Sequence, residues 1–189
     1  WNTNLRGREY LPAKWVARLP EETRARIERV HGGPSIADDY LRFLVSELKP
    51  RIDRTFRTRT GPRDTSIMGS SMGGLISFYA MGEYPQVFGQ AAALSIHWPL
   101  ADPREAGPEE PAAIVGAVGD WLSASSIRPR RNRLYVDVGT ETLDAFYGPY
   151  ADAFRPMMVA RGWYPGCRGM ERVFTGTAGN DSIRGTVLG

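Results

Sequence analysis

The chain has 189 residues, of which 42% are hydrophobic and 24% charged, and a net charge of +3. This length and hydrophobic content predict one globular domain with a packed core and exclude a disordered chain. No apolar run approaches the roughly 20 residues that a membrane-spanning helix needs. A single cysteine, Cys167, excludes an internal disulfide framework, and the two histidines, His31 and His97, are too few for a histidine-rich metal centre. We therefore expect neither a metal, nor a cofactor, nor a membrane partner.

The first predicted elements are two helices. Pro20 and two glutamates open the first helix, and Gly32 and Gly33 close it. The second helix starts near residue 36, and Pro50 predicts a kink or a new start within it. Its apolar face is expected to contain Ile36, Tyr40, Phe43, Leu44 and Leu48, with Ile52 and Phe56 continuing the same period.

Short β-rich runs then alternate with helical periods, which is typical of a parallel α/β sheet. Strands are predicted at residues 65–69, 90–95, 133–138 and 171–175, and helices at about 73–84, 111–124 and 145–161. The nearly continuous apolar run at 90–95 suits a strand buried on both faces. Residues 98–110 are rich in proline and charge and are expected to form an exposed loop. The fold class that follows is α/β, a three-layer α/β/α sandwich in a single domain.

Two arginine clusters lie just before predicted strands, at residues 51–63 and 128–133. All but two of the 24 basic residues are arginines, the exceptions being Lys14 and Lys49. Nucleic-acid binding would need a basic stripe with interleaved stacking aromatics or a recognisable module, and neither is present. The clusters are therefore interpreted as solvated loops between helices and strands, with no nucleic-acid partner.

The sequence Gly69-Ser70-Ser71-Met72-Gly73 has the pattern G-x-S-x-G between a predicted strand and a predicted helix. A nucleophile elbow needs a sharp turn of this kind, which holds one serine above the edge of the sheet. We expect glycine on both sides to remove Cβ atoms that would collide with the neighbouring strand and helix. The Met72 N–H, at the start of the helix, would face a developing oxyanion. A tight glycine turn with an incidental serine is the structural alternative.

A serine nucleophile needs a base and a carboxylate that orients the base. In this fold the acid follows a later strand, and residues 139–144 offer Asp144, which we favour, and Glu141. Asp137 lies inside the strand and fits less well. These carboxylates could instead be solvated, or Asp144 could cap the next helix. The histidine should follow the strand at 171–175, yet residues 176–181 contain none.

The segments SIMGSSMGGLISFYAMGEYPQVFG, LSIHWP and LYVDVGTETLDAFYGPYADAF resemble the putative esterase family of α/β-hydrolases, which is related to esterase D, enterochelin esterases, feruloyl esterases and mycolyltransferases. The resemblance extends over about residues 1–178. It implies an α/β-hydrolase-like, mostly parallel sheet, with Ser71 as nucleophile and Asp144 or Glu141 as acid. The family's histidine motif aligns with Gly179-Asn180-Asp181, so glycine stands where histidine is expected. The family's first strands, including the loop with the second oxyanion donor, would precede residue 1. We accordingly expect a partial, N-terminally truncated domain over residues 1–189 with an altered C-terminus.

His97 follows the strand at 90–95 and is the candidate replacement for the missing base. At the carboxyl edge of the sheet it could take the Ser71 proton directly or through one water. The alternative is that His97 packs beside Trp98 or lines the pocket. His31 is expected to complement the C-terminus of its helix.

These observations predict a serine carboxylesterase for small or aromatic acyl esters. Two alternatives stay open: a non-catalytic or weakly active binding or assembly module, and an acyltransferase. Four aromatic residues could line the ester pocket or pack in the core: Tyr147, Tyr150, Trp163 and Tyr164. Exposed sheet edges would favour homo-oligomers. The expected partner is a small ester, and the expected compartment is the bacterial cytoplasm.

Overall fold

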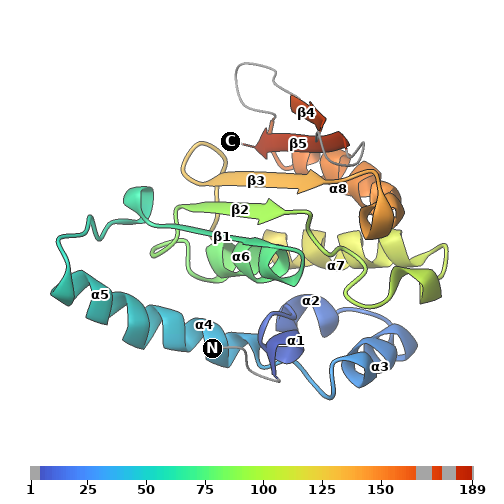
Figure 1. Cartoon of the computed structure of the whole chain (residues 1–189), viewed down its shortest axis with the longest axis horizontal. Coiled ribbons are helices and arrows are strands. Elements are labelled where there is room, and N and C mark those ends of the chain that lie inside the picture. The colour runs from blue at the N-terminus through green and yellow to red at the C-terminus, as the bar shows by residue number, and fades with distance from the viewer. Residues whose placement is uncertain (1–4, 165–171, 176–181, 189) are drawn as a thin grey trace.

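One five-stranded sheet organises the molecule. The computed structural model describes residues 5–164, 172–175 and 182–188. The strands lie in the order β1-β2-β3-β5-β4 (Figure 1). Strands β1, β2 and β3 are parallel, and β5 runs antiparallel to both of its neighbours. Their bounds are β1 Ser66–Ser70, β2 Gln90–Leu94, β3 Arg133–Val138, β4 Arg172–Thr175 and β5 Ser182–Leu188. The mostly parallel, α/β-hydrolase-like sheet predicted from the sequence is therefore confirmed.

The described helical elements are α1 Arg6–Glu9, α2 Ala13–Val16, α3 Glu21–Val30, α4 Ala37–Phe43, η1 Leu44–Leu48, α5 Lys49–Thr55, η2 Pro62–Asp64, α6 Met72–Glu83, η3 Pro103–Glu105, α7 Glu110–Ala124, η4 Thr142–Phe146 and α8 Gly148–Ala160. The predicted helices at 73–84 and 111–124 are confirmed to within one residue at each end. The predicted helix at 145–161 is two elements, η4 and α8. None of the helices in the described ranges is both long and apolar enough to cross a membrane.

The hydrophobic core extends from the sheet through helices α6, α7 and α8 to the N-terminal helices, where Trp15 and Leu41 are fully buried. Helix α6 contacts both β1 and β2, and it comes so close to β2 that a Cβ added at Gly74 would be 3.2 Å from the Ala93 Cα. Phe78 of α6 stacks edge-on against Trp121 of α7 and Phe154 of α8, at centroid distances of 5.4 and 5.9 Å. This aromatic cluster fixes the three helices against one another and against one face of the sheet.

The opposite face of the sheet is open along β1. Ser66, Met68 and Ser70 point away from α6 and are exposed, Met68 by 67%. In β2 only alternate residues, Ala91 and Ala93, are fully buried, so the expectation of a strand buried on both faces is wrong. Helices α6, α7 and α8 lie against the other face of the sheet (Figure 1).

The segment after β2 is more buried than its composition suggests. Trp98 and Leu100 are fully buried, and the Trp98 ring lies 4.7 Å from the Phe154 ring. The expectation that residues 98–110 form an exposed loop is therefore wrong for its first part. The proline and charge content of this segment does not predict which of its side chains are buried in the core.

Helices α4 and α5 form one continuous rod joined by a π-helical turn, and Pro50 lies in the first turn of α5. A proline lacks the N–H that an uninterrupted α-helix would need, and the wider turn before it accommodates that loss. The predicted apolar face is partly wrong. Ala37 and Leu41 are the residues buried in α4, whereas Phe43 and Leu48 are exposed.

Candidate active site

Ser71 sits at the turn from β1 into α6 with a strained backbone, φ 59° and ψ −122°. This is a region that non-glycine residues rarely occupy, and such strain persists only where the surroundings impose it. Here the end of β2 and the segment just after it hold the backbone on both sides of Ser71. The Ser71 N–H donates to the Leu94 carbonyl at 2.9 Å, and the His97 N–H donates to the Ser71 carbonyl at 3.4 Å. The turn therefore holds Ser71 at the carboxyl edge of the sheet.

The two glycines of the motif play different parts. A Cβ at Gly69 would lie 2.6 Å from the Gly73 carbonyl oxygen, so any side chain there would force the turn open. A Cβ at Gly73 would meet nothing within 4 Å. The expectation of a collision at both positions is thus right for Gly69 and wrong for Gly73. The close helix–strand contact is made one residue later, at Gly74.

The Met72 N–H is the first of helix α6, and it donates to no acceptor within the described part of the chain. The first N–H groups of a helix have no partner inside the helix, and the helix dipole adds partial positive charge there. The Met72 side chain is buried, which fixes this end of the helix. The geometry thus presents one backbone donor beside Ser71.

The candidate acids differ sharply in their surroundings. Asp144 lies in η4, where its carboxylate accepts hydrogen bonds from the Gly139 N–H at 2.6 Å and from the Ser95 hydroxyl at 2.6 and 2.8 Å. It does not cap the following helix. Glu141 is exposed. Asp137 is buried within β3 and accepts from the Ser95 N–H.

Ser95, which we did not single out from the sequence, connects β2 to this acid loop. It follows β2 directly, has a φ of 43°, and donates its hydroxyl to Asp144. A polar residue immediately after a buried parallel strand was the available signal, because the carboxyl ends of such strands meet at one edge. The acid loop is thereby held beside the backbone that anchors Ser71.

His97 packs against Tyr147, with its Nδ1 2.5 Å from the Tyr147 hydroxyl and the rings edge-to-face at 5.7 Å. Burial lowers the pKa of His97, opposed by a hydrogen bond to the Ala101 backbone and by the charge of Asp144. Burial also raises the pKa of Tyr147, so this phenol stays protonated at neutral pH. With the ring hydrogen on Nδ1, donated to the Tyr147 oxygen, Nε2 is the nitrogen that accepts a proton; with the phenol donating to Nδ1, Nε2 already carries the hydrogen.

The structure thus gathers Ser71, His97 and Asp144 at one edge of the sheet. No described side chain hydrogen-bonds the Ser71 hydroxyl. Gly179, at the expected position of the family's histidine, lies outside the described residues. The catalytic assignments of Ser71, Met72, His97, Asp144 and Glu141 stay predictions.

The remaining candidates have mainly structural surroundings. The His31 ring contacts the Leu100 carbonyl at 2.6 Å rather than the carbonyls of its own helix. Tyr150 and Trp163 are buried, whereas Tyr164 is exposed.

Comparisons with known proteins agree with this architecture. The model of the family described as "Putative esterase" matches residues 12–151. The chain is 31% identical over 98 residues to the ferri-bacillibactin esterase BesA of Bacillus subtilis, covering 51% of this chain and 32% of that protein. It is 27% identical over 103 residues to the uncharacterized protein YbbA of the same organism, covering 54% of this chain and 35% of that protein.

The matched segments thus span about a third of the length of these curated relatives, and no solved structure gives a significant match. The family match, in contrast, covers most of the chain, including the strained elbow and the loop that carries Asp144. The chain belongs to the putative esterase family of hydrolases.

Proposed function

We propose that this chain is a serine carboxylic-ester hydrolase that works through an acyl-enzyme on Ser71. The observation that carries the proposal is the elbow itself. A serine with a φ of 59° is held between a parallel strand and a twelve-residue helix, beside the Met72 N–H, which has no acceptor among the described residues. Strained backbone at such a turn is typical of catalytic nucleophiles rather than of ordinary glycine turns.

In the proposed reaction the Ser71 Oγ attacks the ester carbonyl carbon while its proton passes to a base. The carbonyl oxygen becomes an oxyanion, which the Met72 N–H stabilises. Collapse of this intermediate expels the alcohol, which takes up the proton. Water then attacks the acyl-enzyme in the same way, releasing the acid and restoring the Ser71 hydroxyl.

The candidate base is His97, acting through Nε2, directly or through one water. Its lowered pKa keeps the imidazole neutral at pH 7, which is the form that can accept a proton. Asp144 is the favoured carboxylate, because it is held between Ser95 and Gly139 next to this histidine. The exposed Glu141 is the alternative acid.

The proposed substrates are small or aromatic acyl esters. Membership of an esterase family supports ester chemistry, as does similarity to a protein named as an esterase. Tyr147, beside His97, is the aromatic residue next to the proposed site; Tyr150 and Trp163 are buried in the core.

Hydrolysis of p-nitrophenyl acetate and butyrate by the purified chain tests the proposal. Ser71→Ala should abolish turnover, and Ser70→Ala, an exposed neighbour on β1, should leave it unchanged. A fluorophosphonate probe should label the wild type and Ser70→Ala but not Ser71→Ala. Equal turnover in wild type and Ser71→Ala would refute Ser71 as the nucleophile.

A second candidate, a non-catalytic binding or assembly module, is supported by one observation. No described base hydrogen-bonds the Ser71 hydroxyl. This candidate predicts background turnover in all three proteins and no fluorophosphonate labelling. His97→Gln separates the two further, because the esterase proposal with His97 as base requires that this variant lose turnover.

A further inference from the structure

The amino ends of the three parallel strands form a second functional edge, opposite Ser71. Ser66, Gln90 and Arg133 are in register at the starts of β1, β2 and β3. The segments before these strands are tied together: the Gly89 N–H donates to the Pro62 carbonyl at 2.9 Å, and the Arg133 N–H to the Gly89 carbonyl at 3.0 Å. Parallel pairing therefore brings the ends of both arginine clusters, at 51–63 and 128–133, to one place.

A cavity of about 800 Å³ opens between these segments. Four arginines line it, Arg63, Arg130, Arg131 and Arg133, with no aspartate, glutamate or aromatic residue among the lining side chains. All four arginines are exposed, and none of them forms an ion pair with a residue in the described ranges. Four uncompensated guanidinium groups around one hollow repel each other, and an anionic ligand would relieve that repulsion.

The neighbouring polar groups reinforce this donor surface. Asp64, the acid next to Arg63 in the sequence, is paired with Arg59 at 3.5 Å. Asn132, 5% exposed, accepts the Arg128 N–H through its Oδ1 at 3.0 Å, so its amide nitrogen remains a donor at the cavity. The Gln90 amide donates to the Arg63 carbonyl at 2.8 Å and holds that segment against β2.

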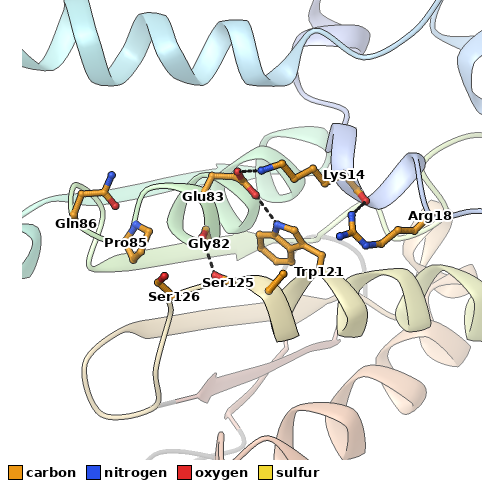
Figure 2. A pocket seen from close by; sticks show the side chains of 10 residues that line it. Lys14, Arg18, Gly82, Glu83, Pro85, Gln86, Trp121, Ser125 and Ser126 are labelled. Carbon is orange, nitrogen blue, oxygen red and sulfur yellow. Dashed lines mark hydrogen bonds and ion pairs between the residues drawn. The ribbon is translucent and has the colours of Figure 1, made fainter.

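An adjacent pocket of about 340 Å³ contains a carboxylate, unlike the arginine-lined cavity. It shares Pro85, Gln86 and Ser126 with the arginine-lined cavity (Figure 2). Its lysine, Lys14, is paired with Glu83, which also accepts a hydrogen bond from the Trp121 indole at 2.7 Å. The charge of Lys14 is thus neutralised within the fold. Arg18, the other cation of this pocket, donates to the Lys14 carbonyl at 2.6 Å, whereas the cavity gathers four arginines without a carboxylate among its lining residues.

We propose that the arginine-lined cavity binds a small polyanion carrying two or more phosphate groups. Guanidinium groups present planar pairs of N–H donors that match phosphate oxygens, and four of them suit a ligand with several such groups. The volume falls in the range of small-molecule sites. The lining lacks the aromatic side chains on which the bases of a single-stranded nucleic acid would stack, which favours a small ligand over a nucleic acid.

This site is independent of the proposed esterase activity. Strand β1 places its first residue, Ser66, five residues before Ser71, a separation of about 16 Å at about 3.3 Å per residue. Binding at one edge and ester turnover at the other can therefore be measured separately.

Isothermal titration calorimetry with sodium tripolyphosphate, pyrophosphate and orthophosphate, at matched ionic strength, tests the proposal. We expect one tripolyphosphate per chain, weaker pyrophosphate binding, and little response to orthophosphate. The triple variant R63Q/R131Q/R133Q should weaken tripolyphosphate binding at least tenfold. The control R51Q/R54Q/R57Q removes the same charge from exposed positions on and just after α5, outside the cavity lining, and should bind as the wild type does.

Circular dichroism melts establish that both triple variants fold, and R131Q alone provides a milder substitution if the cavity variant does not. Absence of tripolyphosphate binding to the wild type would overturn the proposal, as would equal losses in the two triple variants, which would indicate a response to net charge. Tighter binding of a single-stranded oligonucleotide, lost in the cavity variant, would overturn it in favour of a nucleic-acid site.

Discussion

The clearest test of the elbow geometry is the contrast between Gly69→Ala and Gly73→Ala. Both replace a glycine of the same five-residue motif with the same methyl group. At Gly69 the added Cβ would lie 2.6 Å from the Gly73 carbonyl oxygen and 2.7 Å from its carbon, whereas at Gly73 it would meet open space. The sequence pattern treats these positions as equivalent, and the structure does not.

The expected magnitudes follow from these contacts. Ordinary contacts of a Cβ begin near 3.4 Å, so Gly69→Ala overlaps backbone atoms by several tenths of an ångström. Those atoms belong to the first turn of α6 and cannot rotate away as a flexible side chain would. Overpacking of this kind costs about 1–3 kcal/mol, and we expect about 2–3 kcal/mol here. Gly73→Ala removes a flexible residue from a helix and should stabilise by up to about 0.5–1 kcal/mol.

Urea denaturation of the wild type and the two variants measures these free energies of unfolding directly. For a chain of this size, 2–3 kcal/mol corresponds to a fall in Tm of about 4–12 °C. Gly69→Ala should also lower ester turnover, because it displaces the strained turn at Ser71. Equal stabilities for the two variants, or a more stable Gly69→Ala, would refute the packing assigned to this turn.

Four further predictions concern the core, the site and the sheet edge. Phe78→Ala should destabilise the fold by about 3–5 kcal/mol in urea denaturation, because Phe78 contacts three other aromatic rings. The change at the exposed Phe146→Ala should be less than about 0.5 kcal/mol. Ser95→Ala removes a half-buried hydroxyl bonded to the Asp144 carboxylate and should cost about 1–2 kcal/mol in urea denaturation and lower ester turnover; unchanged turnover would contradict the role given to Asp144. Burial lowers the pKa of His97, so the unfolded chain takes up this proton first as pH falls. The free energy of unfolding should therefore decrease below about pH 6.5, and less so in His97→Asn, whereas an identical pH dependence in that variant would contradict a buried neutral imidazole. Strand β1 has described hydrogen-bond partners on one side, so light scattering should detect association, and a monomer at high concentration would argue against it.

Local signals in the sequence were sufficient for much of the fold. Alternation of β-rich and helical runs predicted the parallel strands β1, β2 and β3 to within one residue at every end. Strand β5 was missed, since its pairing with β3 brings together segments about 50 residues apart, and no local pattern encodes that pairing. The loop that starts at Trp98 was wrongly predicted to be exposed. Trp98 is buried against the Phe154 ring of α8, a contact between segments that are distant in the sequence.

In the candidate site, too, local motifs were predictable from the sequence, whereas contacts between distant segments were not. The G-x-S-x-G pattern identified Ser71 and Met72, because a strand-to-helix turn of this sharpness requires a particular local sequence. The position of Ser95 between the elbow and Asp144 could not be predicted, because it depends on a strand pairing and on the backbone angle of one residue. Likewise, the sequence named His97 as a base, but its contact with Tyr147, fifty residues later, appears only in the folded chain.

By itself, then, the sequence determined the class of fold, the nucleophile candidate and the family, because these depend on periodicity and on short contiguous motifs. The tertiary structure decided which glycine of the elbow is sterically required, what holds Asp144, and which nitrogen of His97 is occupied. It also determined where the arginines lie. From the sequence alone, the two arginine clusters were interpreted as separate solvated loops. Parallel pairing of β1, β2 and β3 aligns their amino ends, and so places four of these charges around one cavity. Charges distant in sequence interact through space, and their spacing is set by strand register rather than by residue number.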